Sequence, residues 1–343
     1  MRKFISLITI VTFCSIGYGQ SLKGKIIKDF ITSSLLHNEG GENTTRRLTI
    51  YLPPKYDETN ERYPVLYYLH GFTMTDSLTQ AEVDILDLAI NSGKIRPIIF
   101  VVSNQNTNYE GSFYSNSTLN GNWADFTAKA VVEYVDNKFR TISNRNSRGI
   151  CGHSMGGYGA IKLAMLFPDI FSSVYALSPG FLALVKEFGP NSESYKQLAL
   201  IKNKEDLKKL YFPKAIVAVA RAWSPNLSNP PFYCDVQFKY KGDSLIVDNV
   251  VLDKWNKNLP IMMIDNYIEN IKKLKAIKLD WGRNDGSRFP VMCMMFSQKL
   301  ENLGIEHFAE EYIGTHMNKI WTIDGRVLNS MLPFFNTYLT FKN

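Results

Sequence analysis

The sequence has few cysteines and no long apolar segment. Its 343 residues hold four cysteines, Cys14, Cys151, Cys234 and Cys293. Their spacing matches neither a disulfide framework nor a zinc site, and a bridge between Cys234 and Cys293 is left open. No segment approaches the roughly 20 uninterrupted apolar residues that span a bilayer. We therefore expect no stable membrane span in the mature protein, and no residue cluster implies a cofactor or a metal.

The sequence also has no block of like charge, no internal repeat and no linker rich in proline, glycine or serine. A formal charge of +7 comes from 39 Lys and Arg against 32 Asp and Glu, but the basic residues are scattered. Scattered lysines are typical of a solvated surface, whereas nucleic-acid binding needs a clustered patch or a known module. We expect no nucleic-acid partner and one large domain.

The N-terminus differs from the rest of the chain. Basic residues open it, the run 4–16 is almost wholly apolar, and two glycines follow. This layout predicts a signal peptide over residues 1–19, a mature catalytic domain over 20–343, and a secreted or periplasmic protein. Lipid attachment at Cys14 is the less favoured reading, because the bulky Phe13 stands where such signals want a small residue.

Apolar runs alternate with segments of helical periodicity along most of the chain. This order predicts an α/β fold with a mostly parallel central sheet and helices on both faces. Between 180 and 260 the pattern changes to lysine-rich helical stretches and a proline-dense segment, which indicates an insertion over the active site. The predicted strands are 47–52, 64–69, 97–102, 148–151, 174–177, 276–281 and 308–312, and the predicted helices are 81–91, 124–139, 156–166 and 327–339.

Gly152-His153-Ser154-Met155-Gly156 has the form of a nucleophile elbow. In this motif a sharp strand-to-helix turn lifts a serine above the sheet, and small residues permit the close packing. An apolar strand precedes the motif and a glycine-rich helix start follows it, as the elbow requires. We expect Ser154 to be the nucleophile.

A serine hydroxyl needs an imidazole to take its proton, and in this fold the chain order is serine, acid, histidine. His307 and His316 lie downstream of Ser154, and His316 is favoured because it follows a strand where His307 starts one. Asp285 follows the strand 276–281 in a loop and is favoured as the acid over Asp280, which lies inside that strand.

The oxyanion of the tetrahedral intermediate needs backbone amides that already point at it. The amide directly after the nucleophile belongs to Met155, and the loop after the strand 64–69 supplies that of Phe72. His70, which ends that strand, is expected to shape this loop rather than to react. Phe113, Tyr114, Trp223 and Tyr233 are candidates for lining an aromatic or sugar pocket, with ordinary packing as the alternative.

These residues resemble the Putative esterase family of α/β-hydrolases, which includes feruloyl and acetyl-xylan esterases, enterochelin esterases, S-formylglutathione hydrolase and mycolyltransferases. The resemblance implies an α/β-hydrolase fold, a triad at Ser154, Asp285 and His316, and oxyanion amides at Phe72 and Met155. The chain departs at His153, where many members carry Leu, and at Met317, where many carry a polar or acidic residue. The likeness rests on 51–54, 63–71, 123–126, 139–141, 152–159, 167–169, 230–233, 282–285 and 314–316.

The function that follows is a secreted serine hydrolase that cleaves carboxylic esters through an acyl-enzyme. Its expected partner is a small-molecule or polysaccharide ester, with feruloyl or acetyl esters of polysaccharide favoured. The alternatives are a siderophore trilactone esterase, an acyltransferase, or a carbohydrate-binding protein that has lost the chemistry.

Overall fold

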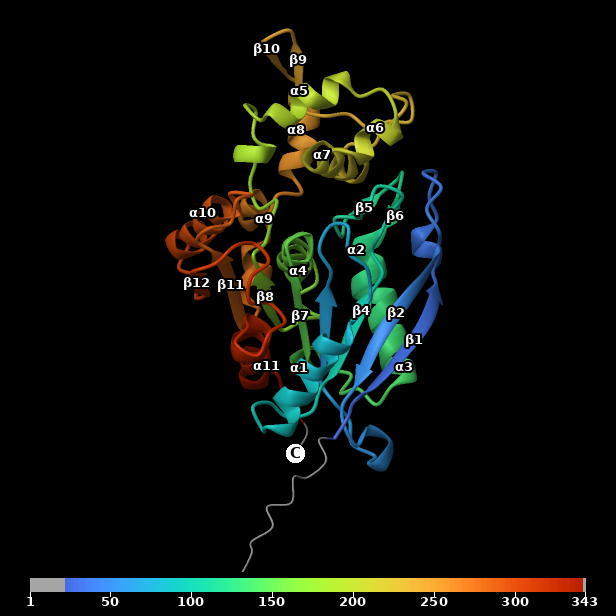
Figure 1. The fold of residues 1–343 in the computed structure, drawn as a ribbon, viewed down its shortest axis with the longest axis vertical. Helices are drawn as coiled ribbons and strands as arrows, with labels where there is room; N and C mark the ends of the chain where they lie inside the picture. The colour runs from blue at the N-terminus through green and yellow to red at the C-terminus, as the bar shows by residue number, and fades with distance from the viewer. Residues whose placement is uncertain (1–21, 342–343) are drawn as a thin grey trace, which may run out of the picture.

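A computed structural model describes residues 22–341, so the predicted signal peptide and Cys14 lie outside the described residues. A twisted eight-stranded sheet runs through the molecule (Figure 1) in the order β1-β2-β4-β3-β7-β8-β11-β12. Strands β1 and β2 pair antiparallel, β2 pairs antiparallel with β4, and every later neighbour is parallel. The bounds are β1 (Lys25–Thr32), β2 (Thr45–Leu52), β3 (Val65–Leu69), β4 (Ile99–Ser103), β7 (Arg148–His153), β8 (Ser173–Leu177), β11 (Ala276–Gly282) and β12 (Phe308–Tyr312).

Helices cover both faces of the sheet because its central strands are apolar on both sides. In β3, Val65, Tyr67 and Leu69 pack toward one face, and Leu66 and Tyr68 toward the other. Helices α3, α4, α9 and α10 bury the first face, and α1 and α11 the second. Their bounds are α1 (Gln80–Asn91), α2 (Trp123–Asp125), α3 (Val131–Lys138), α4 (Met155–Leu166), α9 (Pro260–Lys272), α10 (Phe289–Asn302) and α11 (Leu332–Tyr338), with π-helical turns at Phe126–Ala130 and Val327–Met331 before α3 and α11.

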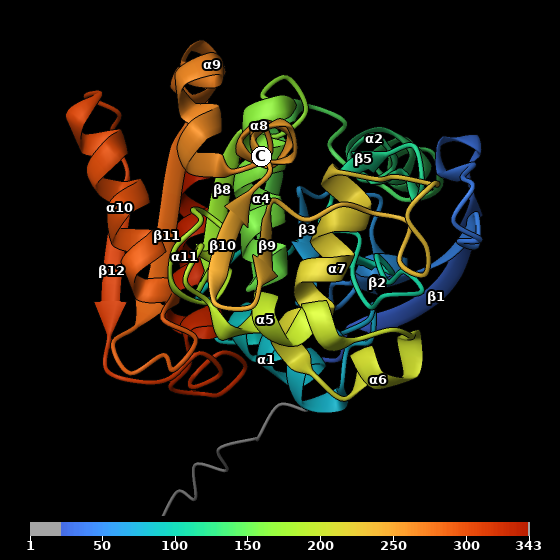
Figure 2. The same cartoon turned by 90° about the horizontal axis from the view of Figure 1, so that it is seen from above.

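The segment between β8 and α9 lies over the carboxyl ends of the parallel strands (Figure 1). Seen from above, α5, α7 and the β9–β10 hairpin lie in front of the strands (Figure 2). This is the segment whose composition predicts an insertion. Its elements are α5 (Glu193–Leu200), α6 (Lys204–Lys208), α7 (Tyr211–Trp223), β9 (Phe238–Lys241), β10 (Ser244–Val247) and α8 (Asn249–Asn256); a short hairpin of β5 (Asn116–Ser117) and β6 (Gly121–Asn122) precedes α2.

Four details differ from the sequence-based expectations or complete them. The predicted helix 124–139 is interrupted by a π-helical turn, and β12, expected as an apolar strand, is a largely exposed edge strand that carries Glu310 and Glu311. Cys151, Cys234 and Cys293 are each free and buried, so the structure has no bridge between the last two. Between residues 22 and 341, no helix has the length and apolarity to cross a bilayer.

Candidate active site

Ser154 stands at a strained turn between β7 and α4. Its backbone angles, φ 60° and ψ −117°, lie in a region that side-chain-bearing residues rarely adopt. The turn is held from both sides, because the Ser154 N–H donates to the Leu177 carbonyl and the Ser154 carbonyl accepts from Gly180. A Cβ at Gly156 would lie 1.8 Å from the Leu69 carbonyl oxygen, so only glycine permits α4 to start this close to β3.

Asp285 and His316 come together above the ends of β11 and β12. The His316 Nδ1–H donates to Asp285 Oδ2 at 2.7 Å, and Asp285 Oδ1 accepts from the Ser287 amide at 2.8 Å. The Asp285 side chain is fully buried, while 18% of the His316 side chain is exposed. The carboxylate therefore fixes the imidazole tautomer that leaves Nε2 free to accept a proton.

The His316 ring lies beside the elbow. It is 4.6 Å from the ring of His153, the residue before Ser154, and 5.1 Å from the ring of Phe289. Phe289 and Ser154 line one cavity. No group within residues 22–341 is hydrogen-bonded to the Ser154 hydroxyl, and such bonds in hydrolases often tighten only when substrate binds.

The two rejected candidates have other partners. Asp280 is buried inside β11, where it pairs with Arg326 and accepts from the Tyr175 hydroxyl at 2.9 Å. Burial raises its pKa. His307 bonds to the Ser297 hydroxyl and to the Ile305 carbonyl, at the opposite end of β12 from His316.

The amides of Phe72 and Met155 are both available to an oxyanion. Met155 is the first residue of α4, so its N–H has no carbonyl partner within the helix. The Phe72 N–H is bonded to no backbone carbonyl of the described chain. The side chains of Phe72 and Met155 both pack against Gly111, where an added Cβ would lie 2.6 Å from Met155 Sδ and 2.7 Å from Phe72 Cδ2.

His70 is a buried, neutral part of the loop that carries Phe72. Its Nε2 accepts from the Gln105 amide at 2.9 Å, so the proton sits on Nδ1, which donates to the Gly71 carbonyl at 2.9 Å. Burial lowers the pKa of His70 to about 4. The Tyr114 hydroxyl donates to the His70 carbonyl at 2.8 Å. This network fixes the loop and leaves no ring nitrogen for proton transfer.

A small aromatic cavity opens at Ser154. Its volume is about 20 Å³, enough to hold one water molecule. Both the sheet and the insertion contribute walls, and Tyr211 at the start of α7 is half exposed. The lining residues are Phe72, Phe113, Ser154, Met155, Gly180, Phe181, Phe188, Tyr211, Ala215 and Phe289.

Only one of the four aromatic candidates named from the sequence lines this cavity, namely Phe113. Tyr114 and Trp223 are core residues, and Tyr233 lies at a separate surface recess. Sequence reasoning missed Phe289, whose position after the Asp285 loop is the one signal that could have drawn attention to it. It singled out His153 as a departure from the family but did not predict its contact, in which Nε2–H donates to the His316 carbonyl at 3.0 Å.

A family model described as Putative esterase matches residues 42–332. The chain belongs to this esterase family. Its mostly parallel sheet, elbow and helices on both faces form an α/β-hydrolase fold, as the sequence predicts.

Among curated proteins, an esterase of Mycobacterium tuberculosis is 33% identical over 165 residues, 47% of this chain and 33% of its own length. S-formylglutathione hydrolase of Paracoccus denitrificans is 32% identical over 160 residues, 42% of this chain and 55% of its own length. The chain thus spans between a third and just over half of the length of these relatives.

Solved structures resemble most of the chain. A ferulic acid esterase superposes with a TM-score of 0.64 at 21% identity, covering 93% of this chain and 100% of that one. S-formylglutathione hydrolase from Agrobacterium tumefaciens gives 0.62 at 14% identity, covering 94% and 98%. At these identities the likeness concerns the fold.

Proposed function

We propose that the protein is a serine hydrolase of carboxylic esters that works through an acyl-enzyme. The observation that carries the proposal is the buried Asp285–His316 hydrogen bond of 2.7 Å beside the strained Ser154 elbow. Nucleophile, base and orienting acid then follow the chain order of the α/β-hydrolase triad. Membership of the esterase family supports the same reaction.

In this mechanism His316 Nε2 takes the Ser154 proton as Oγ attacks the ester carbonyl. The amides of Phe72 and Met155 stabilise the resulting oxyanion, an interaction worth about 3 kcal/mol for one donor in such sites. The imidazolium, stabilised by Asp285, gives its proton to the leaving alcohol. Water then repeats the sequence on the acyl-enzyme and releases the acid.

For the substrate we propose an acetyl or feruloyl ester of a polysaccharide, and the cavity at Ser154 favours acetyl. A volume of about 20 Å³ suits a methyl group, whereas a feruloyl ring needs its aromatic walls to part. The basic and then apolar N-terminal layout supports a secreted or periplasmic protein. Outside the cytosol, such a protein would meet polysaccharide esters.

The experiment is turnover of nitrophenyl acetate, nitrophenyl butyrate, methyl ferulate and acetylated xylan by wild type and Ser154→Ala. We expect wild type to release acid from at least one ester, acetate fastest, and the variant to lose at least 10⁴-fold in kcat, as nucleophile removal does in serine hydrolases. Covalent labelling by a fluorophosphonate in wild type alone checks the nucleophile. Full turnover by Ser154→Ala would refute the proposal.

A further inference from the structure

A second, larger recess lies on the opposite face of the sheet from the aromatic cavity. Its volume is about 510 Å³. Tyr68 and Val102 line it, and both belong to the core layer that packs against α1 and α11. Phe113 and Phe181, which line the aromatic cavity, belong to the other layer. The two spaces therefore lie on either side of the edge formed by the carboxyl ends of the parallel strands. This edge carries Ser154 and is called the sheet edge below.

The recess borders the reactive groups. His153, which precedes Ser154, and Met317, which follows His316, both line it. Met74 lines it too, and a Cβ added at Gly71 would lie 3.3 Å from Met74 Sδ and 3.6 Å from Ser154 Cβ. One glycine thus separates a wall of the recess from the nucleophile.

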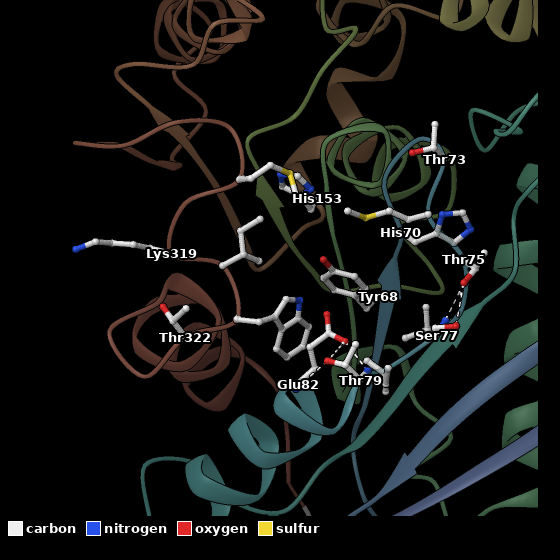
Figure 3. A pocket seen from close by; sticks show the side chains of 16 residues that line it. Tyr68, His70, Thr73, Thr75, Ser77, Thr79, Glu82, His153, Lys319 and Thr322 are labelled. Carbon is white, nitrogen blue, oxygen red and sulfur yellow. Dashed lines mark hydrogen bonds between the residues drawn. The ribbon is translucent and has the colours of Figure 1, made fainter. Parts of the chain in front are cut away.

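Hydroxyl groups and aromatic rings make up much of the lining. Thr73, Thr75 and Ser77 lie to one side of Tyr68 (Figure 3), and the Trp321 ring packs edge-on against the Tyr68 ring, with 5.6 Å between ring centres. Flat aromatic rings with nearby hydroxyls suit a ligand with both apolar faces and hydroxyl groups.

The recess offers little to a charged ligand. Its one lysine, Lys319, extends away from the other labelled side chains (Figure 3) and pairs with Asp324 at 3.2 Å. Its one carboxylate, Glu82, accepts from the Thr79 amide and hydroxyl through Oε2. A neutral ligand avoids the cost of desolvating a charge that has no partner here.

We propose that this recess binds a sugar unit on the alcohol side of the ester. The inference rests on the proposed ester hydrolysis and names its leaving group. The acyl and alcohol groups extend from the tetrahedral carbon in different directions. An acyl group in the aromatic cavity therefore points the alcohol away from that cavity. The recess is large enough for a sugar ring and is lined by His153 and Met317, the neighbours of Ser154 and His316, with Trp321 as the stacking surface.

Direct binding tests the recess without any catalysis. Ser154→Ala protein is titrated with xylotetraose and with cellotetraose by calorimetry. We expect one of them to bind, and Trp321→Ala in the same background to weaken that binding at least tenfold. Ile323→Ala is the matched control, because Ile323 is 74% exposed on the same loop and does not line the recess. Binding of neither sugar, or equal binding by the Trp321 variant, overturns the proposal.

Kinetics provide the second arm. The ratio of kcat/KM for acetylated xylotetraose to kcat/KM for methyl acetate is measured with Ser154 intact. We expect Trp321→Ala to lower this ratio at least tenfold and Ile323→Ala to leave it unchanged; equal losses on both substrates would indicate damage to the fold and overturn the proposal. If no ester is cleaved at all, the proposed hydrolysis fails while the titration still decides on the sugar.

Discussion

The sheet edge and the insertion build the two halves of one site in different ways. At the sheet edge, main-chain geometry dictates single residues: Gly156 leaves no room for a Cβ, and Ser154 holds backbone angles that its neighbours enforce. In the insertion, side chains pack on side chains, as where the Phe181 and Phe188 rings lie 3.6 Å apart. The placement of the nucleophile is thus fixed by the backbone, and acyl selectivity by side chains that substitution can change.

Within the sheet edge, the roles of the two neighbouring carboxylates Asp285 and Asp280 should differ most. Asp285→Asn should lower kcat by about 10⁴, because an amide permits the wrong tautomer of His316, while thermal unfolding stays near that of wild type. Asp280→Asn should instead destabilise the fold by about 3 kcal/mol, since it leaves the buried charge of Arg326 without its ion-pair partner. Turnover of nitrophenyl acetate and urea unfolding measure the two effects.

A reversal of these outcomes would contradict the assignment of the acid. If Asp280→Asn folded normally but lost 10⁴ in kcat, the carboxylate inside β11 would be the catalytic one. Asp285→Glu is the matched control, because it keeps the charge and should retain more activity than the asparagine variant.

Lys162 joins the two regions and should make their docking pH-dependent. It lies buried on α4, where Nζ donates to Ser115 Oγ at 2.6 Å and to Asn258 Oδ1, at the end of the insertion, at 2.7 Å. Burial lowers its pKa to about 7 from 10.5. Between these values the unfolded chain binds a proton that the folded chain does not, so stability should rise from pH 7 to about pH 10.5 and stay level below pH 7.

Urea unfolding of wild type and Lys162→Met at pH 7 and pH 9 checks this sign. Wild type should gain roughly 2 kcal/mol relative to the methionine variant over that interval, given 1.36 kcal/mol for each unit of pKa. A constant difference between the two proteins would show that Lys162 titrates normally.

The sequence predicts the residues of the sheet edge better than those of the insertion, for physical reasons. Strand, turn and helix signals around Ser154 are local, and the position of Asp285 after its strand separates it from Asp280 inside the strand. Contacts between distant side chains leave no such signal: His153 and His316 are 163 residues apart. Lys162 sits on a helix whose pattern gives no sign that a lysine is buried, and aromatic packing in the insertion depends on the tertiary fold.

The insertion should control acyl length. Tyr211 packs edge-on against Phe72 at 5.7 Å and closes one side of the aromatic cavity. Tyr211→Ala should raise kcat/KM for nitrophenyl butyrate relative to the acetate by about tenfold, because two further methylenes gain roughly 0.8 kcal/mol each when buried. Leu200→Ala, at an 80% exposed position of α5 outside the cavity, should leave the ratio unchanged. An unaltered ratio in the Tyr211 variant would place the acyl group elsewhere.

Substitution of His153 tests whether a side chain at the sheet edge also positions the base, His316. Its Nε2–H donates to the His316 carbonyl at 3.0 Å, and burial lowers its pKa well below the usual value, so the ring acts as a neutral donor. His153→Leu should lower kcat about fivefold with KM unchanged, as expected when one hydrogen bond worth about 1 kcal/mol is lost. His153→Gln, which keeps a donor, should recover most of the rate. If the glutamine and leucine variants are equally slow, ring packing against His316 rather than this hydrogen bond holds the base, and the sheet edge would then depend on side-chain packing as the insertion does.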